Sequence, residues 1–421
     1  MDYCKRCVYP ANARPGIIFD EEGVCSGCRV IESRKDIDWN GREQMLVDLL
    51  RSYQAQQRAK ENPYDCIIPV SGGKDSSYQT WLMREKYQMN PLLVSYNHTF
   101  NTPLGLRNLT NLIDKTDCNL VRFTTAPGAA KRLAKYMLMK VGDITWHYHA
   151  GIQTFPIQAA IQYDIPLIVW GEEGYSELLG MHNQDDFVEF TKKKRQEHSM
   201  RGFEPYDLLE ELDCPLSLYD LAPFCYPSDE EIERAGVRGI YLSNYISWNA
   251  RAQTDFIIEQ LGFETSQGRD RTFNIYDKLD DVHANGLHDY LKYLKFGYGR
   301  ATDDASTEIR HGRITREKGI ELVMKYDPVR PRDMDIFLRA VDMTEEELLL
   351  LVEPMRDSTI WEKTKDGVWT TKDHVGNHMD DPGVGEVRVP LNEQSSPFIQ
   401  TPEKTSPHAQ RTTEQSEYVI L

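Results

Sequence analysis

Short, mostly apolar runs alternate with amphipathic stretches between residues 65 and 175. The runs are residues 66–70, 91–96, 119–123 and 166–170. The stretches between them predict helices over residues 74–87, 104–117, 128–141 and 151–163. Apolar strands separated by helices are typical of a parallel sheet that is covered on both faces. The pattern therefore predicts an α/β fold with a doubly wound parallel sheet.

The segments on either side follow other patterns. Residues 40–60 predict an amphipathic helix, which ends near Asn62-Pro63. Beyond residue 180 we expect a mostly helical part, with helices over residues 250–261, 310–326 and 344–353. After about residue 380, Pro, Ser, Thr, Gln and Glu dominate, which is typical of a disordered tail. The predicted division is a small N-terminal cysteine module (1–35), an α/β domain (36–180), a helical region completing the fold (181–380) and a tail (381–421).

The charge of the chain narrows the classes of function. Its 421 residues carry 49 Lys and Arg against 66 Asp and Glu, a net charge of −17. This balance disfavours a broad nucleic-acid surface but allows a local basic pocket for one nucleotide. No apolar run approaches the ~18 residues that span a bilayer, and no apolar segment follows the first charges. We expect a cytoplasmic protein with no nucleic-acid or membrane partner.

Four of the eight cysteines lie in the first 28 residues. Cys4, Cys7, Cys25 and Cys28 form two C-x-x-C pairs, which fit four thiolate ligands of a structural zinc ion. An iron–sulfur cluster or a chance pairing is the alternative. We expect two metal-binding knuckles joined by a β-ribbon, forming a zinc-ribbon module that the metal helps to fold. The scattered Cys66, Cys118, Cys214 and Cys225 are more typical of core residues.

The segment Ser71-Gly72-Gly73-Lys74-Asp75-Ser76 lies between a predicted strand and a predicted helix. Two glycines let backbone N–H groups converge on an anion, and the helix N-terminus adds positive potential. Asp75 would repel phosphate unless a magnesium ion bridged the two. The spacing matches neither the common P-loop nor the dinucleotide-binding motif. A plain Gly-Gly turn is the alternative.

This loop resembles the PP-loop of the ATP pyrophosphatase superfamily, whose members cleave ATP to AMP and pyrophosphate. The resemblance implies that Ser71, Gly72, Gly73, Lys74, Asp75 and Ser76 hold pyrophosphate and Mg²⁺, with Asp75 at the magnesium. It places Tyr96 near adenine, and Gly171 and Glu172 at the carboxyl edge of the sheet. Lys74, Asp75 and Glu172 become the candidate catalytic residues, although Glu172 could equally be a solvated loop acid.

Several further motifs resemble the N-acetyl sugar amidotransferases of bacterial surface-polysaccharide synthesis. The likeness spans about residues 1–375 and is carried by Tyr3-Cys4-x-x-Cys7-Val8-x-Pro10, Cys25-x-x-Cys28, Trp170-Gly171-Glu172, Asn244-Tyr245-Ile246-Ser247-Trp248 and the stretch 295–303. One departure is Glu173-Gly174, where the family pattern has Asn-Pro.

The resemblance implies a reaction and partners. ATP would adenylate the acetamido oxygen of an N-acetylated sugar, carried on UDP, and ammonia would displace AMP to give an acetamidino sugar for O-antigen. The cofactors would be ATP, Mg²⁺ and structural Zn²⁺. Ammonia would come from separate glutaminase and channelling subunits, similar to the imidazole glycerol phosphate synthase pair. A homodimer is compatible with the sequence.

Residues 295–310 are the best substrate candidates in the sequence. Lys295, Arg300 and Arg310 could bind a diphosphate or a sugar carboxylate, Asp303 could bind sugar hydroxyls, and Gly297 and Gly299 could allow close approach. The alternative is a segment held by Arg–Asp pairs. His147 and His149 precede a predicted helix and could face the ATP edge, with His149 the candidate substrate ligand, although a buried structural role is common for histidine.

Two other functions compete with the amidotransferase. A tRNA thiolation enzyme can carry the same loop and zinc knuckles, but the net charge and the lack of a further C-x-x-C pair disfavour it. A zinc-ribbon protein that only senses ATP is the non-enzymatic alternative, and Asp75 and Glu172 argue against it.

Overall fold

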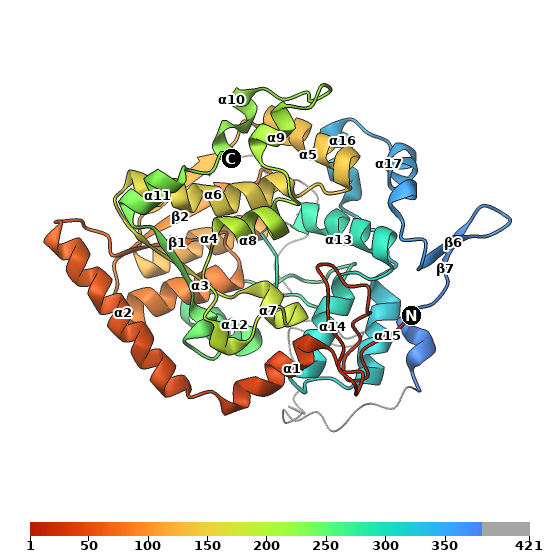
Figure 1. Cartoon of the computed structure of the whole chain (residues 1–421), viewed down its shortest axis with the longest axis horizontal. Helices are drawn as coiled ribbons and strands as arrows, with labels where there is room; N and C mark the ends of the chain where they lie inside the picture. The colour runs from red at the N-terminus through yellow and green to blue at the C-terminus, as the bar shows by residue number, and fades with distance from the viewer. Residues whose placement is uncertain (281, 381–421) are drawn as a thin grey trace.

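The computed structural model, which describes residues 1–280 and 282–380, contains a parallel five-stranded sheet, whose strands β1 and β2 lie in the left half of Figure 1. The strand order is β3-β2-β1-β4-β5, and every pairing is parallel. The strands are β1 (Cys66–Pro69), β2 (Pro91–Asn97), β3 (Leu120–Thr124), β4 (Leu167–Trp170) and β5 (Arg238–Tyr241). The predicted α/β class with a doubly wound sheet is confirmed.

The described residues contain seventeen α-helices. They are α1 (Ser26–Ser33), α2 (Trp39–Ala59), α3 (Lys74–Trp81), α4 (Pro103–Thr116), α5 (Pro127–Val141), α6 (Trp146–Gln162), α7 (Gly174–Leu179), α8 (Lys192–Lys194), α9 (Pro205–Leu209), α10 (Leu218–Leu221), α11 (Asp229–Ala235), α12 (Ala250–Leu261), α13 (Val282–Phe296), α14 (Arg300–Arg310), α15 (Arg316–Tyr326), α16 (Met334–Val341) and α17 (Glu345–Val352). None of the described helices combines the length and the apolar character needed to cross a membrane.

Each face of the sheet has its own core, because successive strand residues point to opposite sides. Cys66 and Ile68 of β1 join the core formed with α2, α3, α4 and α12. Ile67 between them joins the core formed with α5 and α6. Both faces of β1 are therefore buried, which explains the continuous apolar run in its sequence.

The N-terminal cysteine module has no core of its own. Tyr3, Cys4, Cys7, Val8 and the other apolar residues of this module are buried in one cluster with α14 and α15. In Figure 1 the module lies directly against these two helices. The module therefore depends on a segment that lies about 300 residues further along the chain.

Three details of the sequence prediction were wrong. The expected β-ribbon is reduced to two isolated bridges, Tyr3–Pro10 and Phe19–Cys25. The expected helix 310–326 begins only at Arg316, because α14 ends at Arg310 and Gly312 has a φ of +68°; the side chain of Thr315 caps the new helix by accepting from Lys318 N. The fifth strand, β5, comes from the region expected to be helical, beyond the predicted domain boundary at residue 180.

A short antiparallel pair, β6 (Trp361–Lys363) and β7 (Trp369–Thr371), lies near the C-terminal end of the described chain. The predicted tail, 381–421, lies outside the described residues.

The strand order also locates the functional site. Strand β1 is hydrogen-bonded to β2 on one side and to β4 on the other. In such sheets the connections leave in opposite directions at this point, and ligands bind beyond the carboxyl ends of the two strands. The loops after β1 and β4, which contain the predicted nucleotide residues, therefore meet at one edge.

Candidate active site

The loop after β1 has the geometry of an anion-binding turn. Gly72 has a φ of +90°, and a Cβ there would lie 2.4 Å from the carbonyl oxygen of Gly105, so only glycine fits. Gly73 is the N-cap of α3, and its carbonyl accepts hydrogen bonds from the hydroxyls of Ser76 (3.0 Å) and Ser77 (2.9 Å). Helix α3 therefore begins at Lys74 and presents its N-terminus at this edge, where backbone N–H groups favour an anion.

Lys74 is a buried cation between two carboxylates. Its Nζ lies 2.6 Å from Asp75 Oδ2 and 3.3 Å from Asp277 Oδ1. Burial alone would lower the pKa of this ammonium group, but the charges of Asp277 and Asp75 outweigh burial and raise that pKa well above its usual value. Lys74 is therefore positively charged in the unliganded protein.

The same place holds more negative than positive charge. The carboxyl groups of Glu172 and Glu177 lie close enough to Asp75 for their charges to interact with it. Asp277 and Asp280 contribute two more carboxyl groups. Burial raises the pKa of Asp75 and of Glu172, and the carboxylate of Glu177 raises that of Glu172 further. Burial also raises the pKa of Asp280 to about 6. Ionisation of such a carboxyl group is unfavourable on its own, and a bound cation makes it favourable.

Asp75 also has an unused ligand atom. Its Oδ1 is buried and has no hydrogen-bond partner within residues 1–280 and 282–380. An oxygen donor beside other carboxylates and a phosphate-binding turn matches the preference of Mg²⁺. The residues at this edge therefore fit a magnesium ion held by Asp75.

Three carboxylates of this edge were not predicted from the sequence. Asp277 and Asp280 lie about 200 residues after the loop, and Glu177 lies one turn into α7. The only signal for the first two is an acidic stretch before α13. Nothing in that stretch alone indicates that it reaches β1.

The loop after β4 is held by packing and by a helix cap. A Cβ on Gly171 would lie 2.8 Å from Gln79 Oε1, so Gly171 allows close packing on α3. Glu173, which replaces the asparagine of the family pattern, caps α7 by accepting from Ser176 N at 2.6 Å and pairs with Lys194 at 2.5 Å. Glu172 is half-buried, and after burial and Glu177 the charge of Asp75 also raises its pKa.

Tyr96 is anchored within the protein. Its hydroxyl lies 3.1 Å from Thr125 Oγ1 and 3.3 Å from His147 Nδ1, and its ring packs on Gly151. The predicted contact with adenine stays a prediction, since Tyr96 is buried and its hydroxyl already has partners.

The two histidines at the start of α6 each keep one unused ring nitrogen. His147 Nε2 and His149 Nδ1 are buried and have no hydrogen-bond partner within the described ranges. Burial lowers the pKa of both rings to about 3, so both are neutral at pH 7. His149 lies near His288, with ring centroids 6.5 Å apart. Of the five predicted substrate residues, His149 and Arg310 each keep a buried hydrogen-bonding atom, Nδ1 and Nε, with no partner in the described part of the chain.

The other four predicted substrate residues have partners inside the protein. Lys295 Nζ donates to the carbonyl of Gly142 at 2.8 Å. Arg300 pairs with the buried Asp289 at 2.8 and 3.0 Å. Asp303 accepts from Tyr9 at 2.5 Å and pairs with Lys292 at 2.8 Å. The alternative interpretation of this stretch, charges that hold the fold together, is the one the geometry supports.

Arg310 and the two glycines of this stretch also contact other parts of the protein. Arg310 donates to the carbonyls of Glu177 (2.8 Å) and Leu178 (2.9 Å). A Cβ on Gly297 would lie 2.6 Å from Ile360, and one on Gly299 would lie 2.7 Å from Asp327. These glycines allow close packing of the chain on itself, so the space expected for a ligand is filled by protein.

The four N-terminal cysteines form a metal-binding group. Their sulfur atoms all lie within 4.8 Å of one another, with Cys4–Cys28 at 3.9 Å and Cys7–Cys25 at 3.6 Å. Zn–S bonds of about 2.3 Å in a tetrahedron place sulfurs about 3.8 Å apart. All four thiols are buried and none is in a disulfide. The donor set and its size therefore fit a zinc ion with four thiolate ligands.

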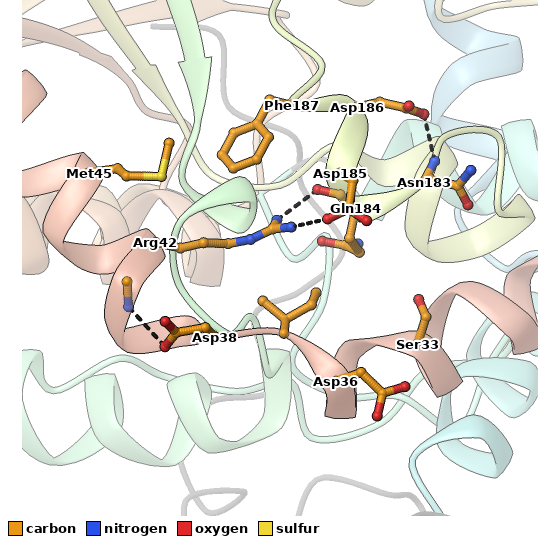
Figure 2. A pocket seen from close by; sticks show the side chains of 12 residues that line it. Ser33, Asp36, Asp38, Arg42, Met45, Asn183, Gln184, Asp185, Asp186 and Phe187 are labelled. Carbon is orange, nitrogen blue, oxygen red and sulfur yellow. Dashed lines mark hydrogen bonds and ion pairs between the residues drawn. The ribbon is translucent and has the colours of Figure 1, made fainter.

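A separate cleft of about 650 Å³ lies between the start of α2 and residues 183–187 (Figure 2). Arg42 crosses it and donates to the carbonyls of Gln184 (2.7 Å) and Asn244 (3.1 Å). Asp38 caps α2, and Asp186 accepts from Asn183 N, so these carboxylates also have partners. No residue of the 71–76 loop lines this cleft, and its acidic rim is unsuited to phosphate.

Comparisons with known proteins bear on the C-terminal part of the chain. Residues 269–375 match the family model described as "LPS biosynthesis protein WbpG-like, C-terminal domain". Over this segment the chain is therefore similar to proteins of LPS biosynthesis. The matched segment includes α13, α14 and two carboxylates of the site, Asp277 and Asp280.

The other comparisons are weaker. An uncharacterized protein from Methanocaldococcus jannaschii is 24% identical over 117 residues, which cover 26% of this chain and 38% of that protein. An NMN synthetase from Francisella tularensis has 13% identity and a TM-score of 0.27, covering 53% of this chain and 96% of that one. An NH3-dependent NAD synthetase from Campylobacter jejuni has 11% identity and a TM-score of 0.26, covering 47% and 95%. Superpositions of this quality do not establish function.

Proposed function

We propose that this protein, whose residues 269–375 match the WbpG-like C-terminal domain, is an ATP-dependent amidotransferase acting on an N-acetylated sugar in surface-polysaccharide synthesis. The observation that carries the proposal is the edge formed by the loops after β1 and β4. There a glycine-rich turn and the N-terminus of α3 favour an anion. Beside them, Asp75, Glu172 and Asp280 have raised pKa values that favour a bound cation. ATP with magnesium satisfies both.

The reaction solves a leaving-group problem. The acetamido oxygen of the sugar attacks the α-phosphorus of ATP, and the bond from that phosphorus to pyrophosphate breaks. Ammonia then adds to the activated carbon, the carbon–oxygen bond to AMP breaks, and one proton is released. The products are AMP, pyrophosphate and a cationic acetamidino sugar. Neither step requires a covalent bond to the protein, so positioning and electrostatic stabilisation supply the rate.

The residues of the site take distinct roles. The backbone of residues 71–73, with Ser71, Ser76 and Lys74, binds the phosphates of ATP, and Asp75 holds magnesium. When bound, that ion neutralises charge on the departing pyrophosphate. Glu172 lies on the loop after β4, where it accepts a proton from the incoming ammonia. His149, neutral at pH 7, offers its free Nδ1 to the sugar.

Substrate, partners and metal belong to the same proposal. The sugar is carried on UDP, and ammonia comes from a separate glutaminase with a channelling subunit. The four-cysteine group binds structural zinc, which has no open position for chemistry because four thiolates complete its tetrahedron. The sequence alternatives, tRNA thiolation and ATP sensing, gain no support from the described residues.

The test is AMP release by the purified full chain. ATP, magnesium, an ammonium salt and a panel of UDP-N-acetyl sugars are supplied, and AMP is measured together with the mass of the sugar. The proposal predicts AMP that requires both ammonium and one sugar, with a product 1 Da lighter than its substrate because NH replaces O. AMP released with tRNA and a sulfur donor instead would overturn it, as would ATP binding with no turnover under either condition while ammonium is saturating.

A further inference from the structure

The four-cysteine module packs directly on α7, the short helix that carries Glu177. The hydroxyl of Ser26, between two of the cysteines, donates to the carbonyl of Leu179 at the end of α7. Gly180 follows with a φ of +65°, and a Cβ there would lie 2.3 Å from the carbonyl carbon of Ser26. In Figure 1 α1, α7 and α14 lie side by side, and their residues are in contact. The knuckle of residues 25–28 therefore packs directly against the C-terminal end of α7.

Arg310 joins the cysteines to α7 through a single guanidinium group. This side chain is buried, and its Nη2 lies 3.4 Å from Cys25 Sγ and 3.8 Å from Cys7 Sγ. Its Nη1 donates to the carbonyls of Glu177 and Leu178, at 2.8 and 2.9 Å. The last carbonyls of a helix lack partners within the helix, so a cation placed there stabilises the helix end. The planar fork of arginine lets one residue serve both sites.

The side chain of Glu177 is held by two residues that directly follow α1 and α14. Arg34, which follows α1, lies 3.3 Å from Glu177 Oε2, and His311, which follows α14, lies 3.5 Å from Glu177 Oε1. Glu177 is buried and in turn acts on Glu172 and Asp75 at the ATP edge. A continuous series of contacts therefore runs from the thiolates through Arg310 and α7 to the carboxylates of the site.

We propose that Arg310 is a positioning residue that couples the metal-bound cysteines to the ATP site by fixing α7, so that zinc occupancy determines where Glu177 and Glu172 stand. The coupling to catalysis rests on the proposed function, whereas the contact between module and helix does not. A zinc ion with four thiolates has a net charge of −2, and Arg310 is the cation that neutralises part of that charge next to Cys7 and Cys25.

The matched variants substitute, one at a time, three arginines that contact the module or Glu177. Arg310→Gln removes both the sulfur contact and the α7 contact. Arg316→Gln removes donation to the carbonyls of Cys4 (3.3 Å) and Cys7 (3.1 Å), which holds the module without touching α7. Arg34→Gln removes the contact with Glu177 and leaves the sulfurs untouched. Arg310→Lys keeps the charge but not the fork.

The primary measurement is hydrogen exchange of the amides of residues 174–180, in the full chain with zinc and after zinc is removed by a chelator. We expect zinc removal to raise their exchange about tenfold or more, while the amides of β1 and β2 stay protected. In the zinc-loaded state Arg310→Gln should raise the same exchange, Arg310→Lys should restore part of the protection, and Arg316→Gln should leave it unchanged. The proposal is overturned if the exchange rates of residues 174–180 change neither when zinc is removed nor when Arg310 is substituted.

Zinc affinity and kinetics supply the second readout. Residues that contact metal ligands typically change metal affinity 10–100-fold when lost. A competing chelator should therefore show weaker zinc binding in Arg310→Gln and wild-type affinity in Arg34→Gln. Both variants should lower kcat for AMP formation with little change in the KM for ATP, because Glu177 stands beside the phosphate-binding turn and not in it. If the wild type forms no AMP, the proposed function fails, while the exchange experiment still decides the coupling.

If zinc removal unfolds the whole chain, seen as loss of protection in β1 and β2, the zinc-loaded Arg310→Lys variant decides. Faster exchange in residues 174–180 of that variant, with β1 and β2 protected, supports the coupling. Unchanged exchange refutes it.

Discussion

Two charged regions of this protein look alike in the sequence and differ in the structure. In the helices α13 and α14, two of the candidate substrate residues have internal counterparts: Arg300 pairs with Asp289, and Asp303 pairs with Lys292. At the edge formed by the loops after β1 and β4, Lys74 stands among several carboxyl groups, and Asp75 keeps a buried oxygen with no partner within the described residues. The first region is balanced without a ligand, and the second is not.

The difference separates a scaffold from a site. Buried charges that pair with each other at 2.8 Å hold helices together and gain nothing from a substrate. Carboxyl groups whose pKa values are raised by burial gain from a bound cation, and such perturbed groups cluster at functional sites. Charge that the fold leaves uncompensated, and not charge as such, therefore indicates where the ligand binds.

The largest expected effect is in the balanced region. Asp289→Asn removes the nearer of the two carboxylates that pair with the buried Arg300 guanidinium and leaves Asp303 at 3.4 Å; Asp289 is fully buried and Arg300 is 8% exposed. Breaking one half of a buried ion pair costs about 3–5 kcal/mol. Urea unfolding should show this loss, while the KM of the folded variant for sugar stays at the wild-type value. A variant with wild-type stability and a raised sugar KM would contradict this structural role and indicate that Arg300 binds the substrate.

The second prediction concerns pH and the unbalanced region. The pKa of Asp280 is raised from 3.8 to about 6, mainly by burial. Between those two pH values the folded state keeps a proton that the unfolded chain has lost, so the stability of the unliganded protein falls as pH rises from about 4 to 6. At 1.36 kcal/mol per unit, the fall is at most about 3 kcal/mol.

Asp280→Asn is the control for that prediction, because asparagine does not titrate. The free energy of unfolding of this variant, relative to wild type, should increase between pH 4.5 and 7. A difference that stays constant with pH, or that changes in the opposite direction, would contradict the raised pKa and with it the surplus of negative charge.

The third prediction separates activity from stability in the same region. Asp75→Asn should lower the rate of AMP formation about 100-fold, the scale of losing one preorganised charge contact. Stability should fall little, because Asp277 still pairs with the Lys74 ammonium group at 3.3 Å and burial already disfavours the ionised carboxyl group that the substitution removes. Glu346→Gln, on an exposed turn of α17, is the matched loss of one negative charge and should behave as wild type. Equal losses of activity and stability at Asp75 would make it a scaffold residue.

The smallest expected effect is at Lys295. Lys295→Met removes one hydrogen bond to the carbonyl of Gly142, which is worth about 0.5–1.5 kcal/mol. Burial lowers the pKa of this lysine, so the loss of its charge costs little more. The sugar KM should stay within about twofold of wild type. A tenfold rise would restore the substrate role that the sequence suggested for this residue.

Much of the fold could be predicted because its signals are local. The strands β1, β2 and β4 bury apolar residues on both faces, and the turn at Gly72 and Gly73 directly precedes α3, so neighbouring residues determine each of these elements. The four cysteines are also predictable, since metal spacing is written in the sequence. Strand β5 was missed because its sequence, Arg-Gly-Ile-Tyr, is not an apolar run.

The substrate region could not be predicted, because its outcome depends on distant partners. Nothing near Arg300 or Arg310 in the sequence indicates that Asp289 and the sulfurs of Cys7 and Cys25 are their partners. Asp277 and Asp280 were missed for the same reason, since only the fold brings them to Lys74 and Ser71. Sequence identifies charged residues, but pairing in three dimensions decides which of them stay available.

The most direct test of the central claim follows one oxygen atom. A UDP-N-acetyl sugar that supports AMP release is labelled with ¹⁸O in its acetamido carbonyl and incubated with ATP, magnesium and ammonium. If the sugar oxygen attacks the α-phosphorus at the loop edge, the AMP gains about 2 mass units and the acetamidino product has no label. Unlabelled AMP, with the label kept in the sugar or released to water, would contradict adenylation of the substrate.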